Sequence, residues 1–310
     1  MSQLSFSSPA KINLFLAITG RREDGFHELV SVAAPVEWGD TLTVEVDETN
    51  SATIPGKFSL TCDDPMVPVN GENLVLKAAE AFRAATSWRR GVRFSLEKRI
   101  PMGAGLGGGS SNAATALRAL NEFAGKPLDS AALTSVAAKV GSDCALFLRD
   151  GPVVMRGRGE LVESLPPAIM ARLTGRSVLI FKPAFGISTA WAYARLAAAA
   201  PKGYLPRAEA ELRLAIWLRA VSGPGKPTTP EANAGDLLYN NMEPPAFEKF
   251  PALPALLERL GKKFGCAAHM SGSGSACFAL LNDRSPVTEI TAAIREAWGD
   301  SAFVVQTRLQ

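Results

Sequence analysis

A glycine-rich run constrains the fold of this chain more than any other feature. It reads Pro101-Met-Gly-Ala-Gly-Leu-Gly-Gly-Gly-Ser-Ser-Asn112, and five of the seven residues from Gly103 to Gly109 are glycine. Before it, Val92 to Lys98 alternates apolar and polar residues, which predicts a half-buried strand. After it, Ser110 to Glu122 is rich in alanine and leucine and opens on residue types that cap helices. The sequence therefore predicts a strand, a glycine loop and a helix, in that order.

Such a loop is suited to a phosphate ligand. Glycine lets backbone N–H groups approach a bulky anion, because no Cβ intervenes and positive φ is allowed. The unpaired N–H groups of the following helix, and the positive end of its dipole, face the same anion. A flexible linker is the alternative, but linkers do not usually lie between a strand and a capped helix.

The common phosphate loops do not match this run well. The Walker loop requires a Gly-Lys-Ser/Thr ending, which is missing. Gly103, Gly105 and Gly108 satisfy the dinucleotide pattern G-x-G-x-x-G, yet no acidic residue closes a βαβ unit about twenty positions later. A protein kinase is excluded because no H-R-D or D-F-G triplet follows.

Composition limits the class of protein. The chain has 310 residues, of which 47% are apolar, so we expect two medium-sized cores. Its net charge of +3 comes from 33 basic residues scattered among 30 acidic ones, which predicts no nucleic-acid partner. The N-terminus lacks a signal-peptide pattern and no apolar run reaches the ~18 residues of a membrane span, which predicts a cytoplasmic protein with no membrane partner. The four cysteines form no C-x-x-C pair, so neither a zinc knuckle nor a disulfide framework is expected.

Four polar residues outside the glycine run are candidates for chemistry. Lys11 and Asn13 interrupt an apolar run from Ser8 to Ile18, and on a strand they would point to the same face. They need partners or a substrate, unless this is an edge strand with a solvated face. His27 follows the turn at Asp24-Gly25 and is either solvated or part of a shared cleft. Asp143 lies in a turn after a helix, where it is either a simple cap or functional.

Two further clusters leave alternatives open. Phe185, Trp191 and Tyr193 are either core packing or a stacking surface for a flat ligand. Ala268 to Leu281 repeats the theme of small residues between strands, which predicts a second backbone-lined anion site or a tight turn beside the first.

Alternation of strands and helices, with no repeat period, predicts an α+β protein. A connection around 166–175 divides it into residues 1–170 and 171–310, and a surface connection is expected over 222–230. The run after Gly141 is predicted to become an apolar strand. The remaining elements are expected as strands at 41–46, 153–159, 177–182 and 303–305, and as helices at 73–85, 129–140, 190–200, 240–263 and 290–298.

Three runs in one order carry a resemblance to a known family. They are Pro9-Ala-Lys-Ile-Asn-Leu, the glycine run and Ser271-Gly-Ser-Gly-Ser-Ala, accompanied by Asp24-Gly-Phe-His and Gly141-Ser-Asp. Together they resemble the GHMP small-molecule kinases, named for galactokinase, homoserine kinase, mevalonate kinase and phosphomevalonate kinase. The resemblance covers nearly the whole chain. It implies an N-terminal ATP-binding domain like domain 2 of ribosomal protein S5, a C-terminal ferredoxin-like α/β sandwich, and an active site in the cleft between them.

The resemblance also implies a reaction and a set of roles. The reaction is ATP-dependent phosphorylation of a small-molecule alcohol with Mg²⁺, by a monomer or weak homodimer. The chain looks most like family members that phosphorylate the 2-hydroxyl of a cytidine diphosphate-linked methylerythritol in non-mevalonate isoprenoid precursor biosynthesis. Asp143 would take the hydroxyl proton, with Lys11 beside it acting on the carboxylate or on the phosphate. The implied ATP-binding residues are Asn73, Leu74, Lys98, Pro101, Met102, Gly103, Ala104, Gly105, Leu106, Gly107, Gly108, Gly109, Ser110 and Ser111, and the implied substrate-binding residues are Asn13, Phe26, His27, Thr189 and Tyr193.

In this scheme the cytosine ring is held between Phe26 and Tyr193 and is hydrogen-bonded by His27, and Ser110 or Ser111 could supply a metal ligand. Two departures from the family pattern stand out. Tyrosine is common where this chain has Phe26, and Val-Pro often follows the catalytic aspartate where this chain has Cys144-Ala145.

Three alternatives to this kinase hypothesis remain. The first is a mevalonate-type or homoserine-type kinase, which would favour an Arg or Lys cluster over a stacking surface. The second is a catalytically silent nucleotide-binding or translation-associated module, against which the presence of both Lys11 and Asp143 argues. The third is a cysteine hydrolase using Cys144, for which no adjacent base is recognisable.

Overall fold

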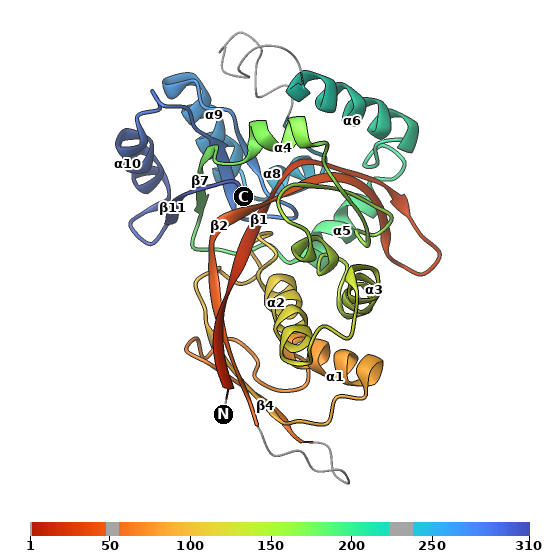
Figure 1. The fold of residues 1–310 in the computed structure, drawn as a ribbon. Helices are drawn as coiled ribbons and strands as arrows, with labels where there is room; N and C mark the ends of the chain where they lie inside the picture. Colours follow the sequence, from red (N-terminus) through yellow and green to blue (C-terminus); the bar gives the residue numbers. More distant parts are fainter. Residues whose placement is uncertain (1, 48–55, 223–237) are drawn as a thin grey trace. The chain divides into compact units, whose positions relative to one another are not determined.

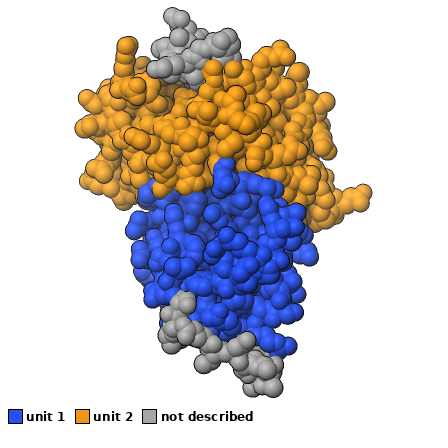
Figure 2. Space-filling view, viewed as in Figure 1, with its two compact units in different colours: residues 1–10, 38–102, 107–150 blue, residues 11–37, 103–106, 151–310 orange. Residues whose placement is uncertain are grey.

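The computed structural model describes residues 2–47, 56–222 and 238–310 (Figure 1). The chain forms two compact units (Figure 2). Unit 1 contains residues 1–10, 38–102 and 107–150, and unit 2 contains residues 11–37, 103–106 and 151–310. Two long strands, β1 (Ser2–Arg21) and β2 (His27–Val46), contribute residues to both units. The division into residues 1–170 and 171–310 stays a prediction about consecutive domains, whereas the compact units interleave along the chain.

Unit 1 combines strands with three helices. The end of β2 pairs antiparallel with β4 (Val92–Glu97), and β4 pairs parallel with β3 (Phe58–Cys62). Every second residue of β4 is buried, as the alternation in the sequence predicts. Helices α1 (Leu74–Thr86), α2 (Gly108–Phe123) and α3 (Ser130–Val140) pack on one another and share an apolar core with the strands. Phe82, Phe94 and Leu117 are among its fully buried side chains.

Helix α2 begins earlier than the sequence predicts. We expected it to start at Ser110 with a side-chain cap, but it starts at Gly108, inside the glycine run. Its N-cap is Gly107 at φ 73°, which makes no side-chain cap hydrogen bond. Because only glycine adopts this left-handed conformation readily, the glycines themselves make the turn into the helix. Ser111 and Asn112 are buried within its first turns.

The apolar run after Asp143 is not a strand, contrary to the prediction. It forms a short 3-10 helix, η1 (Ala145–Leu148), in which Ala145, Leu146 and Phe147 are buried. Turn hydrogen bonds from Cys144 N to Gly141 O and from Phe147 N to Cys144 O satisfy its backbone locally. A short apolar run has no periodicity that separates a strand from a buried helical turn.

Unit 2 is built on a four-stranded antiparallel sheet in the order β11-β7-β10-β9. Its strands are β7 (Ser177–Lys182), β9 (Ala268–Met270), β10 (Cys277–Leu280) and β11 (Phe303–Arg308). Helices α9 (Ala252–Phe264) and α10 (Val287–Trp298) pack together beside it (Figure 1). Within the same unit, β1 pairs parallel with β8 (Tyr239–Asn240), and β2 pairs with the hairpin of β5 (Val153–Arg156) and β6 (Leu161–Ser164).

Other helices of unit 2 refine the predicted organisation. The expected helix at 190–200 is α5 (Thr189–Ala198), and α6 (Arg207–Ser222) was not predicted. The single helix expected at 240–263 is instead α8 (Glu243–Lys249) and α9, which separate at Phe250-Pro251. The predicted connection at 166–175 contains α4 (Pro167–Leu173). Residues 223–230 of the predicted surface connection, and residues 48–55, lie outside the described residues.

Candidate active site

The predicted site residues belong to two groups, one in each compact unit. Lys11, Asn13 and the substrate-binding residues are in unit 2, together with residues 103–106 of the glycine run. Asp143, Asn73, Leu74 and Lys98 are in unit 1, together with Pro101, Met102 and residues 107–111.

Lys11 and Asn13 lie on one face of β1, as predicted. The Lys11 ammonium donates to Asn13 Oδ1 at 2.6 Å, and Asn13 Nδ2 donates to Ser31 Oγ at 3.0 Å. The Ser31 hydroxyl in turn donates to the carbonyl of Phe15 at 2.6 Å. Lys11 is 4% exposed and Asn13 is 6% exposed, which rules out the solvated edge strand. A buried ammonium held in a fixed direction is suited to bind an anionic group.

The glycine run and the second small-residue run are interlocked in unit 2. Ser271 Oγ donates to Gly105 O at 3.1 Å, and Ala276 N donates to Ala104 O at 3.1 Å. A Cβ on Gly105 would lie 2.1 Å from the carbonyl oxygen of Ser271, and Gly105 has a φ of +77°. Both requirements exclude every residue except glycine at this position. The prediction that the two runs lie side by side is confirmed within this unit.

Asn240 holds the second run from the other side, and sequence reasoning missed it. Its Nδ2 donates to the carbonyls of Met270 and Gly272, both at 2.8 Å. It lies at the end of β8, is 4% exposed, and accepts from Met242 N through its Oδ1. The only signal in the sequence was the pair Asn240-Asn241 before a proline-containing helix.

In unit 1, Asp40 binds the backbone just before the glycine run and a side chain at its end, and sequence reasoning missed it too. Its carboxylate accepts from the backbone N–H groups of Arg99 and Ile100, both at 2.7 Å. It also accepts from Lys98 Nζ at 2.7 Å and from Asn112 Nδ2 at 2.9 Å. Asp40 is 1% exposed, so these four donors replace the water that the charge has lost.

Lys98 has a structural partner in addition to its predicted place near the nucleoside. Its side chain is 7% exposed, and its ammonium donates to Asp40 and to Ile100 O at 2.5 Å. The pair fixes the strand end from which the glycine run departs.

The other predicted ATP-binding residues of unit 1 surround the first turns of α1 and α2. Asn73 caps α1 by accepting from Val75 N at 2.9 Å, and Leu74 packs against the core. Ser111 Oγ lies 3.0 Å from Ser8 Oγ and is fully buried. Ser110 is partly exposed in the first turn of α2 and hydrogen-bonds the thiol of Cys144.

Asp143 lies in the turn between α3 and η1 and is partly exposed. The turn is closed by the bond from Cys144 N to Gly141 O at 3.1 Å. Helix η1 has Cys144 at its N-cap position and no side-chain cap, so Asp143 is not its cap.

The thiol of Cys144, the residue after Asp143, is protonated. Burial raises its pKa to about 12, although the hydrogen bond from Ser110 acts to lower that pKa. Cys144 is therefore a thiol at neutral pH, which argues against the cysteine hydrolase.

Two of the predicted substrate-binding residues, His27 and Tyr193, meet where the hairpin between β1 and β2 contacts α5. The rings of His27 and Tyr193 have centroids 4.7 Å apart, and Phe26 is 48% exposed with the Arg158 guanidinium 4.8 Å from its ring centroid. Burial, assisted by the charge of Arg21, lowers the pKa of His27 below its usual value of 6.5. Thr189 Oγ1 lies 3.0 Å from Ser273 Oγ, beside the second small-residue run.

The three aromatic residues around α5 separate into two roles. Phe185 stacks on Phe250 at 5.0 Å, and Trp191 meets Phe250 edge-on at 5.9 Å. Phe185 and Trp191 therefore pack within the protein, while Tyr193 contacts His27.

In the described ranges, no three His, Cys, Asp or Glu side chains come together as a metal-binding group. Within the same ranges no helix combines the length and apolar character needed to cross a bilayer.

Comparison with protein-family models gives two matches. Residues 73–151 match the GHMP kinases N terminal domain, and residues 230–300 match the GHMP kinases C terminal model.

Curated relatives extend the similarity to nearly the whole chain. A 4-diphosphocytidyl-2-C-methyl-D-erythritol kinase of Synechococcus is 38% identical over 93% of this chain and 91% of its own length. The protein of that name from Desulfitobacterium hafniense is 37% identical over 95% of this chain and 93% of its own. A chloroplastic relative from Mentha piperita is 37% identical over 89% of this chain, which spans 63% of the length of that relative.

Solved structures agree with the curated relatives. A crystal structure of 4-(cytidine 5'-diphospho)-2C-methyl-D-erythritol kinase matches with a TM-score of 0.70 and 32% identity, covering 98% of this chain and 99% of that one. A homoserine kinase from Cytophaga hutchinsonii matches with a TM-score of 0.69 at 18% identity, covering 96% of this chain and 95% of that one. The second match shows a common fold alone.

Proposed function

Because this chain belongs to the GHMP kinase family, and within it to the 4-diphosphocytidyl-2-C-methyl-D-erythritol kinases, we propose that it phosphorylates that cytidine compound. The γ-phosphoryl group of ATP goes to the 2-hydroxyl of the methylerythritol, a step of non-mevalonate isoprenoid precursor biosynthesis. The supporting observation is similarity at 32–38% identity over most of the chain to proteins of this one name. Homoserine and mevalonate kinases share the fold at 15–18% identity, so they are not favoured as alternatives.

The glycine run is proposed to hold the phosphates of ATP. Left-handed glycines at Gly103, Gly105 and Gly107 turn the backbone, and α2 starts directly after them. The first N–H groups of a helix have no intrahelical partner, so they and the helix dipole attract phosphate oxygens. Asn73, Leu74 and Lys98 are proposed near the nucleoside end.

Asp143 is proposed as the base and Lys11 as its cationic companion. Phosphoryl transfer asks mainly for positioning and neutralisation of charge, and the attacking hydroxyl must lose a proton. A carboxylate accepts that proton. Asn13 holds the Lys11 ammonium at 2.6 Å, so the charge points in one direction whether it acts on the carboxylate or on the phosphate.

Mg²⁺ is proposed as the second cofactor, and the residues present fit its usual mode of binding. In kinases this ion is bound by one or two protein groups and by substrate phosphates, so no dedicated cluster is needed. Ser110 is partly exposed at the start of α2 and is the better ligand, because Ser111 is fully buried against Ser8. When bound, the ion neutralises charge on the phosphate oxygens.

On the substrate side, Phe26, His27 and Tyr193 are proposed to recognise cytosine, while Asn13 and Thr189 face the remainder of the substrate. A flat base needs aromatic faces and a fixed hydrogen-bonding group, and Phe26 and His27 of the hairpin together with Tyr193 of α5 are proposed to supply them. We also propose that the enzyme is cytoplasmic, that it is a monomer or weak homodimer, and that it has no nucleic-acid or membrane partners.

The test is ADP release by the purified full chain with Mg²⁺-ATP and each of three alcohols. We expect turnover with 4-diphosphocytidyl-2-C-methyl-D-erythritol and none with homoserine or mevalonate. Turnover of mevalonate without turnover of the cytidine compound would overturn the substrate assignment. ADP release that no alcohol stimulates would overturn the kinase assignment itself.

A further inference from the structure

Tyr204 lies beside the group that is proposed to recognise the base, and neither the sequence motifs nor the proposed mechanism uses it. Its ring centroid is 5.9 Å from that of His27, the same imidazole that meets Tyr193 at 4.7 Å. Tyr204 comes from the segment between α5 and α6, about eleven residues after Tyr193 in the sequence. Its contact with His27 depends on how that segment is held.

The backbone around Tyr204 is attached to β1 on both sides. Leu205 N donates to Ile18 O at 3.0 Å, and Asn241 Nδ2 donates to Gly203 O at 3.3 Å and to Ile18 O at 2.8 Å. Asn241 Oδ1 in turn accepts from Ile18 N at 2.8 Å. Tyr204 is therefore fixed relative to the strand that leads into the hairpin of His27.

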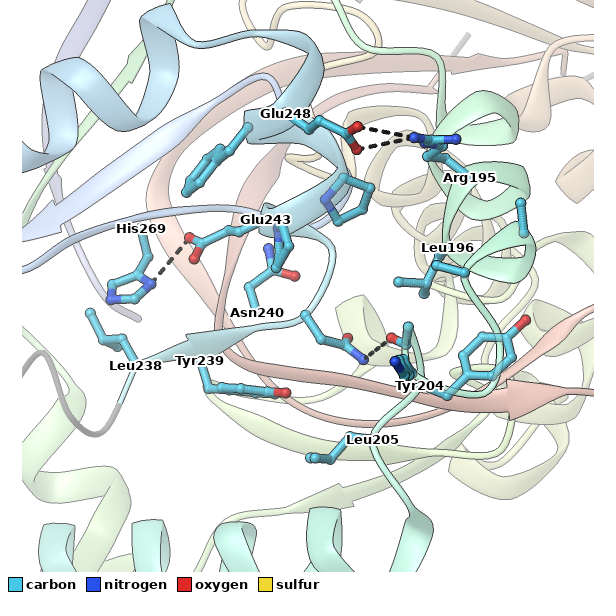
Figure 3. A pocket seen from close by; sticks show the side chains of 18 residues that line it. Arg195, Leu196, Tyr204, Leu205, Leu238, Tyr239, Asn240, Glu243, Glu248 and His269 are labelled. Atoms are coloured by element: carbon cyan, nitrogen blue, oxygen red, sulfur yellow. Dashed lines mark hydrogen bonds and ion pairs between the residues drawn. The ribbon is translucent and has the colours of Figure 1, made fainter.

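The same ring forms part of the wall of a cavity. This cavity has a volume of about 780 Å³ and lies between α5, β8 and α8 in unit 2 (Figure 3). Tyr204 and Leu205 line it from the segment between α5 and α6, and Leu196 lines it from α5. None of the residues predicted for the ATP or cytidine sites lines this cavity. Tyr204 therefore lines this cavity and also contacts His27.

Two polar atoms at the contact are buried without a hydrogen bond. In the described parts of the chain, His27 Nε2 and Tyr204 OH have no hydrogen-bond partner and almost no exposed surface. Buried polar atoms of this kind are rare, and leaving one unpaired costs about 1–3 kcal/mol. Both belong to rings that contact each other, and each atom lacks a partner that a ligand group or an ordered water would supply.

His27 is neutral at physiological pH, which defines what it can bind. The charged and titratable groups that face it are Arg21, Tyr193 and Tyr204. Burial and the positive charge of Arg21 both lower its pKa. A neutral imidazole has one N–H donor and one acceptor nitrogen, and the edge of cytosine offers partners for either.

We propose that Tyr204 is a positioning residue for base recognition: its ring holds the His27 imidazole and shields it from the cavity, and its hydroxyl shares the polar group that His27 Nε2 binds. The identity of that group as part of cytosine, or as a water that cytosine contacts, rests on the proposed function. The positioning of His27 does not.

The test compares three variants. Tyr204→Phe removes only the hydroxyl, Tyr204→Leu removes the ring, and Tyr239→Phe is the matched control. Tyr239 lines the same cavity from β8 but packs on Phe15, with ring centroids 5.5 Å apart. The first readout is the NMR titration of the histidines, of which the chain has only two, His27 and His269. The second is affinity for cytidine 5'-monophosphate, and the third is the KM for each substrate.

Tyr204→Leu lets water reach His27, so the His27 pKa should rise toward 6.5. Affinity for cytidine 5'-monophosphate should fall about 5- to 10-fold, and the KM for the cytidine substrate should rise similarly, with the KM for ATP within about 2-fold. Tyr204→Phe should weaken binding about 2- to 5-fold with a smaller change in the His27 pKa. Because protonated His27 loses its acceptor, affinity should fall as pH drops through the His27 pKa, and this fall should begin at a higher pH in Tyr204→Leu.

Unchanged His27 titration and unchanged cytidine affinity in both Tyr204 variants would overturn the proposal, as would equal effects of Tyr239→Phe. If Tyr204→Leu does not fold, the decision falls to Tyr204→Phe, which keeps the ring. A protein that shows the His27 shift but never phosphorylates the cytidine compound would refute the proposed function and retain the positioning role.

Discussion

Single residues far from the motifs in the sequence hold the two ends of the glycine run in place, and Asp40 is the clearest example. Four donors converge on its buried carboxylate, from Lys98, Arg99, Ile100 and Asn112. Nothing in the local sequence marks it, because a single aspartate in an apolar strand is compatible with an exposed edge. Its role depends on partners about 60 and about 70 positions away in the sequence, and a local sequence pattern contains no information about such distant partners.

Asp40→Asn should lower the free energy of unfolding by about 3–5 kcal/mol, because it leaves the Lys98 ammonium buried without a counter-charge. Urea unfolding measures this. Asp63→Asn is the matched control, since Asp63 accepts from the backbone N of Lys98 at 2.8 Å on the exposed side. Equal stability of the two variants would contradict the role assigned to Asp40.

The reactivity of Cys144 tests the hypothesis that this residue is the nucleophile of a cysteine hydrolase. It is fully buried and burial raises its pKa to about 12, so it should stay unreactive toward iodoacetamide at pH 7.5 in the folded protein. Cys62 is partly exposed and should be labelled before Cys144, Cys266 and Cys277. Mass spectrometry locates the label. Kinase activity that survives in Cys144→Ala is expected, and its loss together with rapid labelling of Cys144 would reopen the hydrolase reading.

At the scale of elements, the glycine run is specified by more than its own flexibility. Gly105 approaches the Ser271 backbone so closely that a methyl group has no room, and Asn240 fixes that backbone from β8. The sequence pattern predicted β4, β7 and α3 well, because β4 is buried at every second residue, β7 is a continuous buried apolar run and α3 has one buried face. It failed at η1 and at the start of α2, where turn hydrogen bonds and left-handed glycines outweigh helix and strand preferences.

Gly105→Ala should destabilise the protein more than Gly125→Ala, which serves as the control. Gly125 has nearly the same φ, +76°, but no atom lies within 4 Å of its would-be Cβ. The control should cost about 1–2 kcal/mol for the left-handed backbone alone. Gly105→Ala adds a clash with a backbone oxygen, so urea unfolding should show a larger loss, and ATP affinity should fall. If both variants lost the same free energy of unfolding, the close contact between Gly105 and Ser271 would not contribute to stability.

At the scale of the whole molecule, the fold and the reaction follow from motifs scattered over the entire chain. The glycine run, Lys11 with Asn13 and the second small-residue run were predicted from residue types whose chemistry is visible locally. Asn240, Tyr204 and Asp40 were not, since each acts through a tertiary contact with a distant strand or loop. The family resemblance supplied the substrate, which no local pattern specifies.

The most direct measurement is single-turnover transfer of the labelled γ-phosphoryl group from Mg²⁺-ATP to 4-diphosphocytidyl-2-C-methyl-D-erythritol, comparing the unaltered chain with Asp143→Asn. ATP affinity is measured on the same samples. We expect transfer by the unaltered chain, and a rate about 10²- to 10⁴-fold lower in Asp143→Asn with ATP affinity changed less than about 2-fold. Near-normal transfer by Asp143→Asn would remove that carboxylate from the reaction, and no transfer by the unaltered chain would contradict the proposed function.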